Sequence, residues 1–371
     1  MKMSRAADPA VRHRNIVIVN DMLWGGGRER RIVQLIAGIN RQGGDNITLV
    51  LLDDRVDYPE VFSLNVNVIK ISRSSNRDFS VFGKLYRLIK AQGACVVNPW
   101  SFMSVFYAAP MCLLAKQPCI GAFVVDCKPP ARFSINWFAM KIGFLLCRGV
   151  VSNSAAGHAA YATPREKRIV IHNGFDSARL KRVALPSTER GPVMIAMIGR
   201  LDKQKDFRTY IDALAILQGK GVAFRAFIVG QGDDHEALKA YTIQRDLRDV
   251  HITGFVSEID TFISGVDIGV LCTDPAHHAE GISNALMEMM AQGKPVVATD
   301  DGGTPEIVDD GNNGILIPPC DAEALAGKLD LLIRDERLRK QLGANAAKTI
   351  ATKFSLDEMA TKFLQVYDGV A

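Results

Sequence analysis

The sequence lacks the patterns that mark proteins with structural zinc sites, membrane-spanning proteins and secreted proteins. Its seven cysteines form no Cys-x-x-Cys pair, so they predict buried thiols in a reducing compartment rather than a metal site. The longest apolar runs, residues 102–115 and 135–147, are interrupted by proline or polar residues and fall short of the roughly 20 residues that span a bilayer. The polar, basic first 14 residues have no apolar core, which argues against a secretory signal.

Acidic residues are scarce in the first half of the chain. Residues 1–185 hold 26 basic and 12 acidic side chains (+14), whereas residues 186–371 hold 19 and 28 (−9). A basic half in a chain of otherwise ordinary globular composition predicts contact with an anionic surface, which a nucleic acid or an anionic membrane would supply. The alternative is that the asymmetry only aids solubility.

The first half has the pattern of a parallel sheet. A short apolar run at residues 15–20 is typical of a buried strand. Gly25, Gly26 and Gly27 follow it, and a helical apolar pattern then leads to the next strand at residues 47–52. Strand, helix and strand with short loops predict a βαβ unit. Further strands are predicted at residues 95–97, 119–125, 150–152 and 168–171.

The pattern restarts after a polar segment with two prolines, residues 184–192, which predicts a linker. Strands are then predicted at residues 193–198, 224–229, 250–253, 268–272, 296–299 and 315–317. Because 371 residues exceed what one core usually holds, we expect an α/β protein of two Rossmann-like domains that face each other across a cleft. The predicted divisions are residues 1–185, residues 186–350 and a C-terminal helical segment, residues 351–371.

The most informative segment lies between Glu280 and Glu288. Gly293 and Pro295 are helix stop signals, so a helix is predicted over residues 283–292. Its first turn offers free N–H groups and the positive end of the helix dipole, which suit a phosphate. The two carboxylates suit the hydroxyls of a sugar and a ribose joined by a diphosphate. Taken singly, each residue favours a simpler interpretation: Glu280 as a solvated loop residue and Glu288 as the partner of a surface lysine.

Loops after other predicted strands add candidates. Arg200 and Lys205 follow the first strand of the second half, where two cations can neutralise the charge on a departing diphosphate. Gly230 ends another strand and is expected to let a nucleoside approach. Thr304 and Pro305 predict the N-cap and first residue of a helix.

Together these segments resemble the nucleotide-binding domain of family 4 glycosyltransferases, which have the GT-B fold. The resemblance covers nearly the whole chain and is most specific in the second half. The matching segments are Gly199-Arg200-Leu201 with Lys205, Val229 to Gly232, Gly254-Phe255, Glu280 to Glu288, Gly293 to Glu306, Ser152-Asn153-Ser154, Asn173-Gly174 with Asp176, and Gly25 to Glu29.

The resemblance implies a retaining transferase with a nucleoside diphosphate sugar as donor, no cofactor and no required metal. The lack of an Asp-x-Asp triplet agrees with metal independence. Glu280 would contact the donor sugar, Glu288 the ribose, and Arg200 with Lys205 the diphosphate; Glu280 and the two cations are catalytic candidates. The donor-binding residues implied in full are Gly25, Gly26, Gly27, Arg200, Lys205, Gly230, Gly254, Phe255, Glu280, Gly281, Ile282, Ser283, Asn284 and Glu288.

One position departs from the family pattern. Many members carry His-Asp at the end of a late strand of the first domain, close to the acceptor, whereas this chain has Val125-Asp126. Asp126 therefore joins the catalytic candidates, in contact with the acceptor hydroxyl or the donor sugar. His277 and His278, just before Glu280, are candidates to compensate for the missing histidine; the alternative is that they are ordinary loop residues.

The favoured function is transfer of a hexose or N-acetylhexosamine from a UDP-sugar to a lipid-linked or glycan acceptor, in the synthesis of envelope polysaccharide or glycoconjugate. GDP-mannose is the alternative donor. A sugar-nucleotide epimerase of similar fold is the alternative enzyme, although such an enzyme needs a base for a carbon-bound proton. A catalytically silent nucleotide-binding subunit is the third possibility.

Basic and apolar side chains of the first half are expected to rest together on an anionic membrane rather than on nucleic acid. This places the protein in the cytoplasm, peripheral at the inner face of the membrane. The alternative is that the apolar side chains belong to the core and the cations are solvated. The side chains concerned are Arg28, Arg30, Arg31, Arg41, Lys84, Arg87, Lys90, Arg132, Trp137, Phe138, Lys141, Phe144, Leu145 and Arg148.

Overall fold

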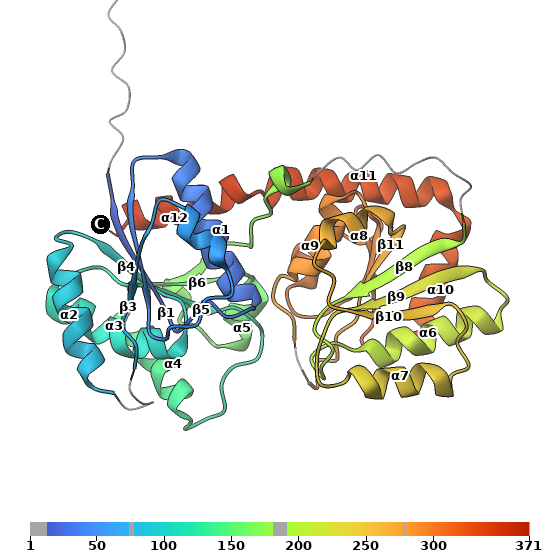
Figure 1. Ribbon diagram of the computed structural model, residues 1–371, viewed down its shortest axis with the longest axis horizontal. Coiled ribbons are helices and arrows are strands. Elements are labelled where there is room, and N and C mark those ends of the chain that lie inside the picture. Colours follow the sequence, from blue (N-terminus) through green and yellow to red (C-terminus); the bar gives the residue numbers. More distant parts are fainter. Residues whose placement is uncertain (1–12, 74–77, 181–190, 278, 371) are drawn as a thin grey trace, which may run out of the picture.

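The computed structural model describes residues 13–73, 78–180, 191–277 and 279–370, which form two α/β lobes (Figure 1). We call residues 13–180 the N-lobe and residues 191–353 the C-lobe. The predicted linker lies almost entirely outside the described residues, and the domain boundaries stay predictions. No helix among the described residues is both long and apolar enough to cross a bilayer.

The N-lobe contains parallel strands in the order β3-β2-β1-β4, and a parallel bridge from Val97 to Cys119 continues this sheet into β5-β6-β7. Its main elements are β1 (Asn15–Asn20), α1 (Gly27–Gln42), β2 (Asn46–Leu51), β3 (Asn67–Lys70), α2 (Ser80–Ala91), β4 (Val96–Pro99), α3 (Phe102–Ala115), β5 (Ile120–Val124), α4 (Ile135–Leu146), β6 (Gly149–Ser152), α5 (Ala155–Ala160) and β7 (Arg168–Val170).

The C-lobe contains one parallel sheet in the order β10-β9-β8-β11-β12-β13, which is the doubly wound arrangement. Its strand order reverses between β8 and β11. Its main elements are β8 (Val193–Ile198), α6 (Phe207–Gly219), β9 (Phe224–Val229), α7 (His235–Gln244), β10 (Val250–Gly254), α8 (Ile259–Gly265), β11 (Ile268–Leu271), α9 (Asn284–Ala291), β12 (Val296–Thr299), β13 (Ile315–Ile317), α10 (Ala322–Arg334) and α11 (Glu336–Lys353).

Each sheet is covered on both faces. In β1, Ile16 and Ile18 pack into the core under α1 and α12 (Leu356–Asp368), whereas Val17 and Val19 pack into the core under α2, α3 and α4. A strand buried on both faces has no polar face, so it is encoded as a continuous apolar run rather than an alternating one. This explains why the buried strands of both halves lie within about two residues of their predicted positions. Of the half-buried edge strands, β7 and β10 were predicted and β3 was missed.

The chain returns to the N-lobe at its C-terminal end. Figure 1 shows α11 along the C-lobe and α12 beside α1, at the other end of the molecule. Phe354 and Ser355 separate these two helices, and Ser355 caps α12 by accepting a hydrogen bond from the Glu358 N–H at 3.1 Å. The ring of Phe363 stacks on Trp100 with centroids 5.6 Å apart. The N-lobe core is therefore completed by residues that follow the C-lobe in sequence.

Several local predictions were wrong. Thr304 lies inside a single 3₁₀ turn, Thr304–Glu306, whose N-cap is Gly303, and no α-helix follows directly. Arg31 is fully buried, with its guanidinium over the rings of Trp100 and Phe363. Phe144 belongs to the core. Neither Arg31 nor Phe144 is available to the proposed membrane face.

Candidate active site

The centre of the candidate site is an ion pair between Lys205 and Glu280. Lys205 lies in the loop after β8 and Glu280 in the loop after β11, the two strands that flank the reversal of strand order. The lysine Nζ contacts the carboxylate Oε2, and the side chains are only 13% and 15% exposed. Ligands of doubly wound sheets bind in the crevice at this point, outside the carboxyl ends of the strands. The residues predicted to hold the diphosphate and the sugar of one donor are thus direct neighbours.

Burial changes the proton affinity of Lys205. Removal from water lowers the pKa of its ammonium group to about 8, although the negative charge of Asp202 acts to raise that pKa. The Glu280 carboxylate beside it favours the charged form. A partly dehydrated cation gains more from an incoming anion than an exposed one does, because water screens the attraction less.

Arg200 and Gly230 occupy the neighbouring loops, and their contacts with a donor stay predictions. The Arg200 side chain is 70% exposed and hydrogen-bonds Gln204 at 3.2 Å, so it lies outside the Lys205–Glu280 pair. Gly230 adopts a φ of +145°, and a Cβ there would lie 1.8 Å from the backbone oxygen of Gly199. The glycine thus makes room for the loop that carries Arg200, and the approach of a nucleoside to it stays a prediction. Gly254 accepts a bond from the Gly230 N–H, and Phe255 is 70% exposed.

The predicted helix after Glu280 is confirmed as α9. Ser283 is its N-cap and accepts a hydrogen bond from the Leu286 N–H at 3.4 Å. Asn173, from the segment after β7, donates to the backbone oxygen of Ile282 and to Asn284 Oδ1, both at 3.0 Å. The first turn of α9 is therefore fixed in place by an N-lobe side chain.

Glu288 is held by arginines. Its side chain is 6% exposed and pairs with Arg30 of α1, while Arg179 lies 3.6 Å from the same oxygen. Arg179 also pairs with Asp260 at 3.2 Å. The alternative interpretation of Glu288 predicted a cationic partner from a surface lysine. The structure gives it cationic partners, but they are two arginines. Contact with a ribose stays a prediction for Glu288, and Arg30 is removed from the proposed membrane face.

The predicted glycine loop of the N-lobe lies against this same segment. Gly26 is the N-cap of α1, and Gly25 donates its N–H to Asp57. A Cβ at Gly27 would lie 3.3 Å from the side-chain nitrogen of Asn284. At Gly281, a Cβ would lie 2.7 Å from the Asn153 side-chain oxygen. The two lobes therefore touch at the residues predicted to bind the donor.

Asp126 lies in the loop after β5, which docks on the Glu280 loop. The Cys127 N–H donates to the backbone oxygen of Ala279 at 3.1 Å, and the Cys127 thiol donates to that of Glu280 at 3.2 Å. Lys128 Nζ donates to the His277 oxygen at 2.7 Å. The two predicted catalytic carboxylates thus lie in adjoining loops of opposite lobes. The His277 ring pairs with Asp274 at 2.7 Å, and His278 lies outside the described residues.

Glu306 connects the lobes in a way that the sequence did not reveal. Its carboxylate accepts hydrogen bonds from the N–H groups of Ala155 and Ala156, each at 2.9 Å, and from His172 Nε2 at 3.0 Å. Burial alone would raise the pKa of Glu306, but these three donors outweigh it and lower the pKa. The carboxylate is therefore charged at neutral pH and ties the C-lobe to the start of α5.

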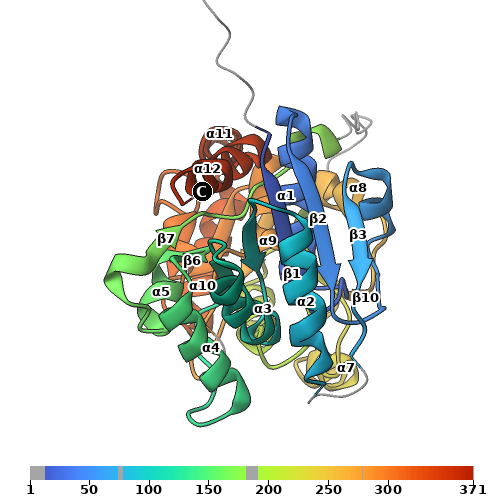
Figure 2. The same ribbon diagram turned by 90° about the vertical axis from the view of Figure 1, so that its left-hand side faces the viewer.

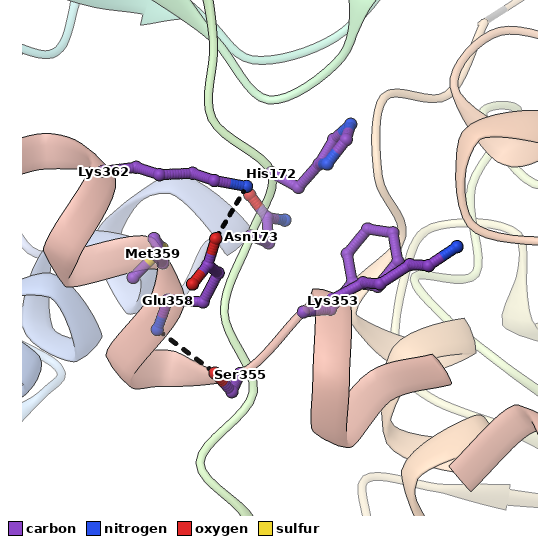
Figure 3. Close-up of a pocket in the computed structure, with 8 residues that line it drawn as sticks. His172, Asn173, Lys353, Ser355, Glu358, Met359 and Lys362 are labelled. Atoms are coloured by element: carbon purple, nitrogen blue, oxygen red, sulfur yellow. Dashed lines mark hydrogen bonds and ion pairs between the residues drawn. The ribbon is translucent and has the colours of Figure 1, made fainter. Parts of the chain in front are cut away.

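A shallow hollow lies beside this contact, where the segment after β7 meets the junction of α11 and α12 (Figure 3). Glu358 and Lys362 face each other in it, with Nζ and Oε1 3.2 Å apart. Because Glu358 and Lys362 already pair with each other, the hollow is a poor match for the predicted ligand. Within the described part of the chain, no cluster of three metal-ligating side chains occurs, and metal independence stays a prediction.

Comparison with known proteins identifies the family. The family model of the glycosyl transferases group 1 matches residues 150–349, which is more than half of the chain, and the protein belongs to this family. The chain is 31% identical to alpha-D-kanosaminyltransferase of Streptomyces kanamyceticus over 47% of its own length and 45% of that protein. It is 38% identical to the putative colanic acid biosynthesis glycosyltransferase WcaL of Escherichia coli K12 over 45% and 42%. The chain thus spans about half the length of the curated relatives it matches.

Solved structures extend the likeness to the whole fold. Anabaena Alr3699/HepE in complex with UDP superposes with a TM-score of 0.82 at 21% identity, covering 96% of this chain and 100% of that one. The lipopolysaccharide glycosyltransferase WaaG gives 0.72 at 16% identity, with 95% and 100% coverage. The predicted GT-B fold, two Rossmann-like domains, is confirmed.

The lowered pKa of Lys205 predicts that donor binding depends on pH. The ammonium group loses its proton as the pH rises through about 8, so affinity for a nucleoside diphosphate should fall above pH 8, by at most about tenfold per pH unit. Calorimetric Kd values between pH 7 and 9.5 measure this. Lys205→Arg keeps its charge over that range and should show a flat profile. A flat wild-type profile would contradict the assignment.

Proposed function

We propose that the protein is a retaining glycosyltransferase that moves a hexose or N-acetylhexosamine from a UDP-sugar to a lipid-linked or glycan acceptor during synthesis of envelope polysaccharide or glycoconjugate. The observation that carries the proposal is the buried Lys205–Glu280 pair at the reversal of strand order, next to the N-terminus of α9. Family membership supports the transfer. UDP in the HepE complex supports the donor, and the colanic acid relative supports the pathway class.

The chemistry proposed for this site needs positioning and charge stabilisation. A bond forms between the acceptor oxygen and C1 of the sugar, while the bond from C1 to the diphosphate oxygen breaks. That oxygen leaves with the bonding electrons and accepts the acceptor's proton on the same face, which retains the anomeric configuration. Lys205 would neutralise the departing diphosphate, Glu280 would orient the sugar hydroxyls, and Asp126 would accept a hydrogen bond from the acceptor.

The membrane proposal now rests on α4 and the loop before it. Ile135, Phe138 and Leu145 are 53%, 50% and 75% exposed and lie along one side of the helix at intervals of three and seven residues. Phe133, in the preceding loop, is 76% exposed. Figure 2 shows α4 on the outside of the N-lobe. The exposed cation Lys141 lies on the same helix, so the face pairs apolar side chains with positive charge, as an anionic lipid surface requires.

This face also leads to the site. The loop between β5 and α4 contains Asp126 at its start and Phe133 near its end. A lipid-linked acceptor bound at α4 would therefore have its headgroup beside the carboxylate proposed to receive it. The arrangement favours a cytoplasmic protein that is peripheral at the inner face of the membrane.

Donor binding and transfer test the function directly. We expect UDP-sugars to bind more tightly than GDP-mannose in a ligand-observed NMR screen, with transfer to lipid-linked acceptors that persists in EDTA. Lys205→Met should lower kcat on the order of 100-fold, because one preorganised cation at the developing charge is lost. Lys203→Met, an exposed lysine of the same loop, is the matched control.

The outcomes separate the alternatives. A preference for GDP-mannose would change the proposed donor and leave the proposed reaction, glycosyl transfer, in place. A new sugar nucleotide formed without any acceptor would instead show an epimerase. Binding of no nucleotide sugar would contradict the proposal altogether.

Membrane binding is tested by flotation with vesicles that contain anionic lipid. We expect binding that weakens as salt rises, since charge attraction is screened within about 8 Å at physiological ionic strength. Phe138→Ser combined with Leu145→Ser should release the protein. Ile243→Ser, an equally exposed apolar residue of the C-lobe, should not. Binding that is indifferent to salt and to the paired substitution would contradict this surface.

A further inference from the structure

A buried tyrosine lies behind the carboxylate proposed to meet the acceptor. Tyr161 is the C-cap residue of α5 and is 4% exposed. Its ring packs into the N-lobe core, stacked near Phe102 with centroids 6.4 Å apart. Its hydroxyl lies 2.8 Å from Asp126 Oδ1 and 3.0 Å from the Lys128 backbone oxygen. No part of the sequence pattern singled out this residue.

The bonds to Asp126 are distributed unevenly. The Lys128 N–H also donates to Oδ1, at 2.9 Å, so Oδ1 has both the amide and the phenol as neighbours. Among the described residues, no hydrogen bond to Oδ2 is found. The protein thus engages Oδ1 and leaves Oδ2 for a ligand. The hydrogen bonds to Oδ1 fix the terminal torsion of the carboxylate, a rotation that is otherwise broad.

We propose that Tyr161 is a positioning residue for the transfer reaction: its hydroxyl holds Asp126 Oδ1 so that Oδ2 meets the acceptor hydroxyl. This inference rests on the proposed function, because it assumes that Asp126 receives the acceptor. Tyr161 itself touches neither donor nor acceptor.

The phenol is suited to this task. Burial and the adjacent Asp126 charge raise the pKa of Tyr161, so its hydroxyl keeps its proton and remains a donor across the working pH range. A hydrogen bond from a neutral donor to a carboxylate is stronger than one between neutral groups. Rigid packing of the ring means that little freedom is lost when the bond forms.

The position of α5 links this bond to the contact between the lobes. The N–H groups of Ala155 and Ala156, in the first turn of α5, bind Glu306 of the C-lobe, and Tyr161 follows the last turn. One short helix therefore contacts the opposite lobe at its start and Asp126 at its end. Helix α5 therefore takes part both in the contact between the lobes and in the orientation of the Asp126 carboxylate.

The test is a kinetic double-mutant cycle on the full chain with a UDP-sugar and acceptor. Tyr161→Phe removes the hydroxyl and keeps the ring, and it should lower kcat about tenfold while the KM for the donor stays unchanged. In an Asp126→Ala background, the same change should have no further effect on kcat, because the group through which Tyr161 acts is already gone.

Tyr210→Phe is the matched control. It removes another buried hydroxyl, which donates to the Ile195 oxygen at 3.2 Å in the C-lobe core, and it should leave kcat unchanged. If wild type transfers sugar and Tyr161→Phe matches it, or if the effects of Tyr161→Phe and Asp126→Ala simply add, the inference is overturned. Absence of transfer by wild type would overturn the proposed function itself, and this inference with it.

Discussion

The meeting of the loops after β8 and β11 determines the candidate site. Strand order reverses between these two strands, so the connections leave them in opposite directions and open a crevice at their carboxyl ends. Lys205 and Glu280 come from these two loops and pair across the crevice. The two residues are 75 positions apart in sequence, so the pair depends on the topology of the sheet. The first turn of α9 lies at the same place because it follows the Glu280 loop in sequence.

Three glutamates of the predicted donor segment are paired within the protein. Glu280 contacts Lys205, Glu288 contacts Arg30 of the N-lobe, and Glu306 contacts His172 of the N-lobe. A buried carboxylate without a partner is costly, so each of these charges is compensated when no ligand is bound. In the function we propose, the donor breaks the Lys205–Glu280 pair: its diphosphate becomes the partner of Lys205, and its sugar hydroxyls become the partners of Glu280. Separation and return of the lobes would then belong to the reaction cycle.

The sequence predicted the elements better than the contacts between them. Strands such as β8 and β9 appear at their predicted bounds because burial on both faces produces unbroken apolar runs, and α9 was marked by its stop signals. Glu306, Arg30 and Tyr161 were missed or misassigned, because their roles depend on partners more than 100 residues away in sequence or, for Tyr161, on a buried bond to a loop 35 residues earlier. Gly230 was marked for close approach of a nucleoside, which stays a prediction; within the protein, the atom that approaches it belongs to Gly199.

A crystal structure with an intact UDP-sugar bound would test the proposed donor site most directly. We predict that Lys205 Nζ leaves Glu280 and donates to a diphosphate oxygen, while the Glu280 carboxylate accepts bonds from the sugar hydroxyls. A nucleotide bound elsewhere, with the Lys205–Glu280 pair unbroken, would contradict the proposal that this ion pair marks the place of the reaction.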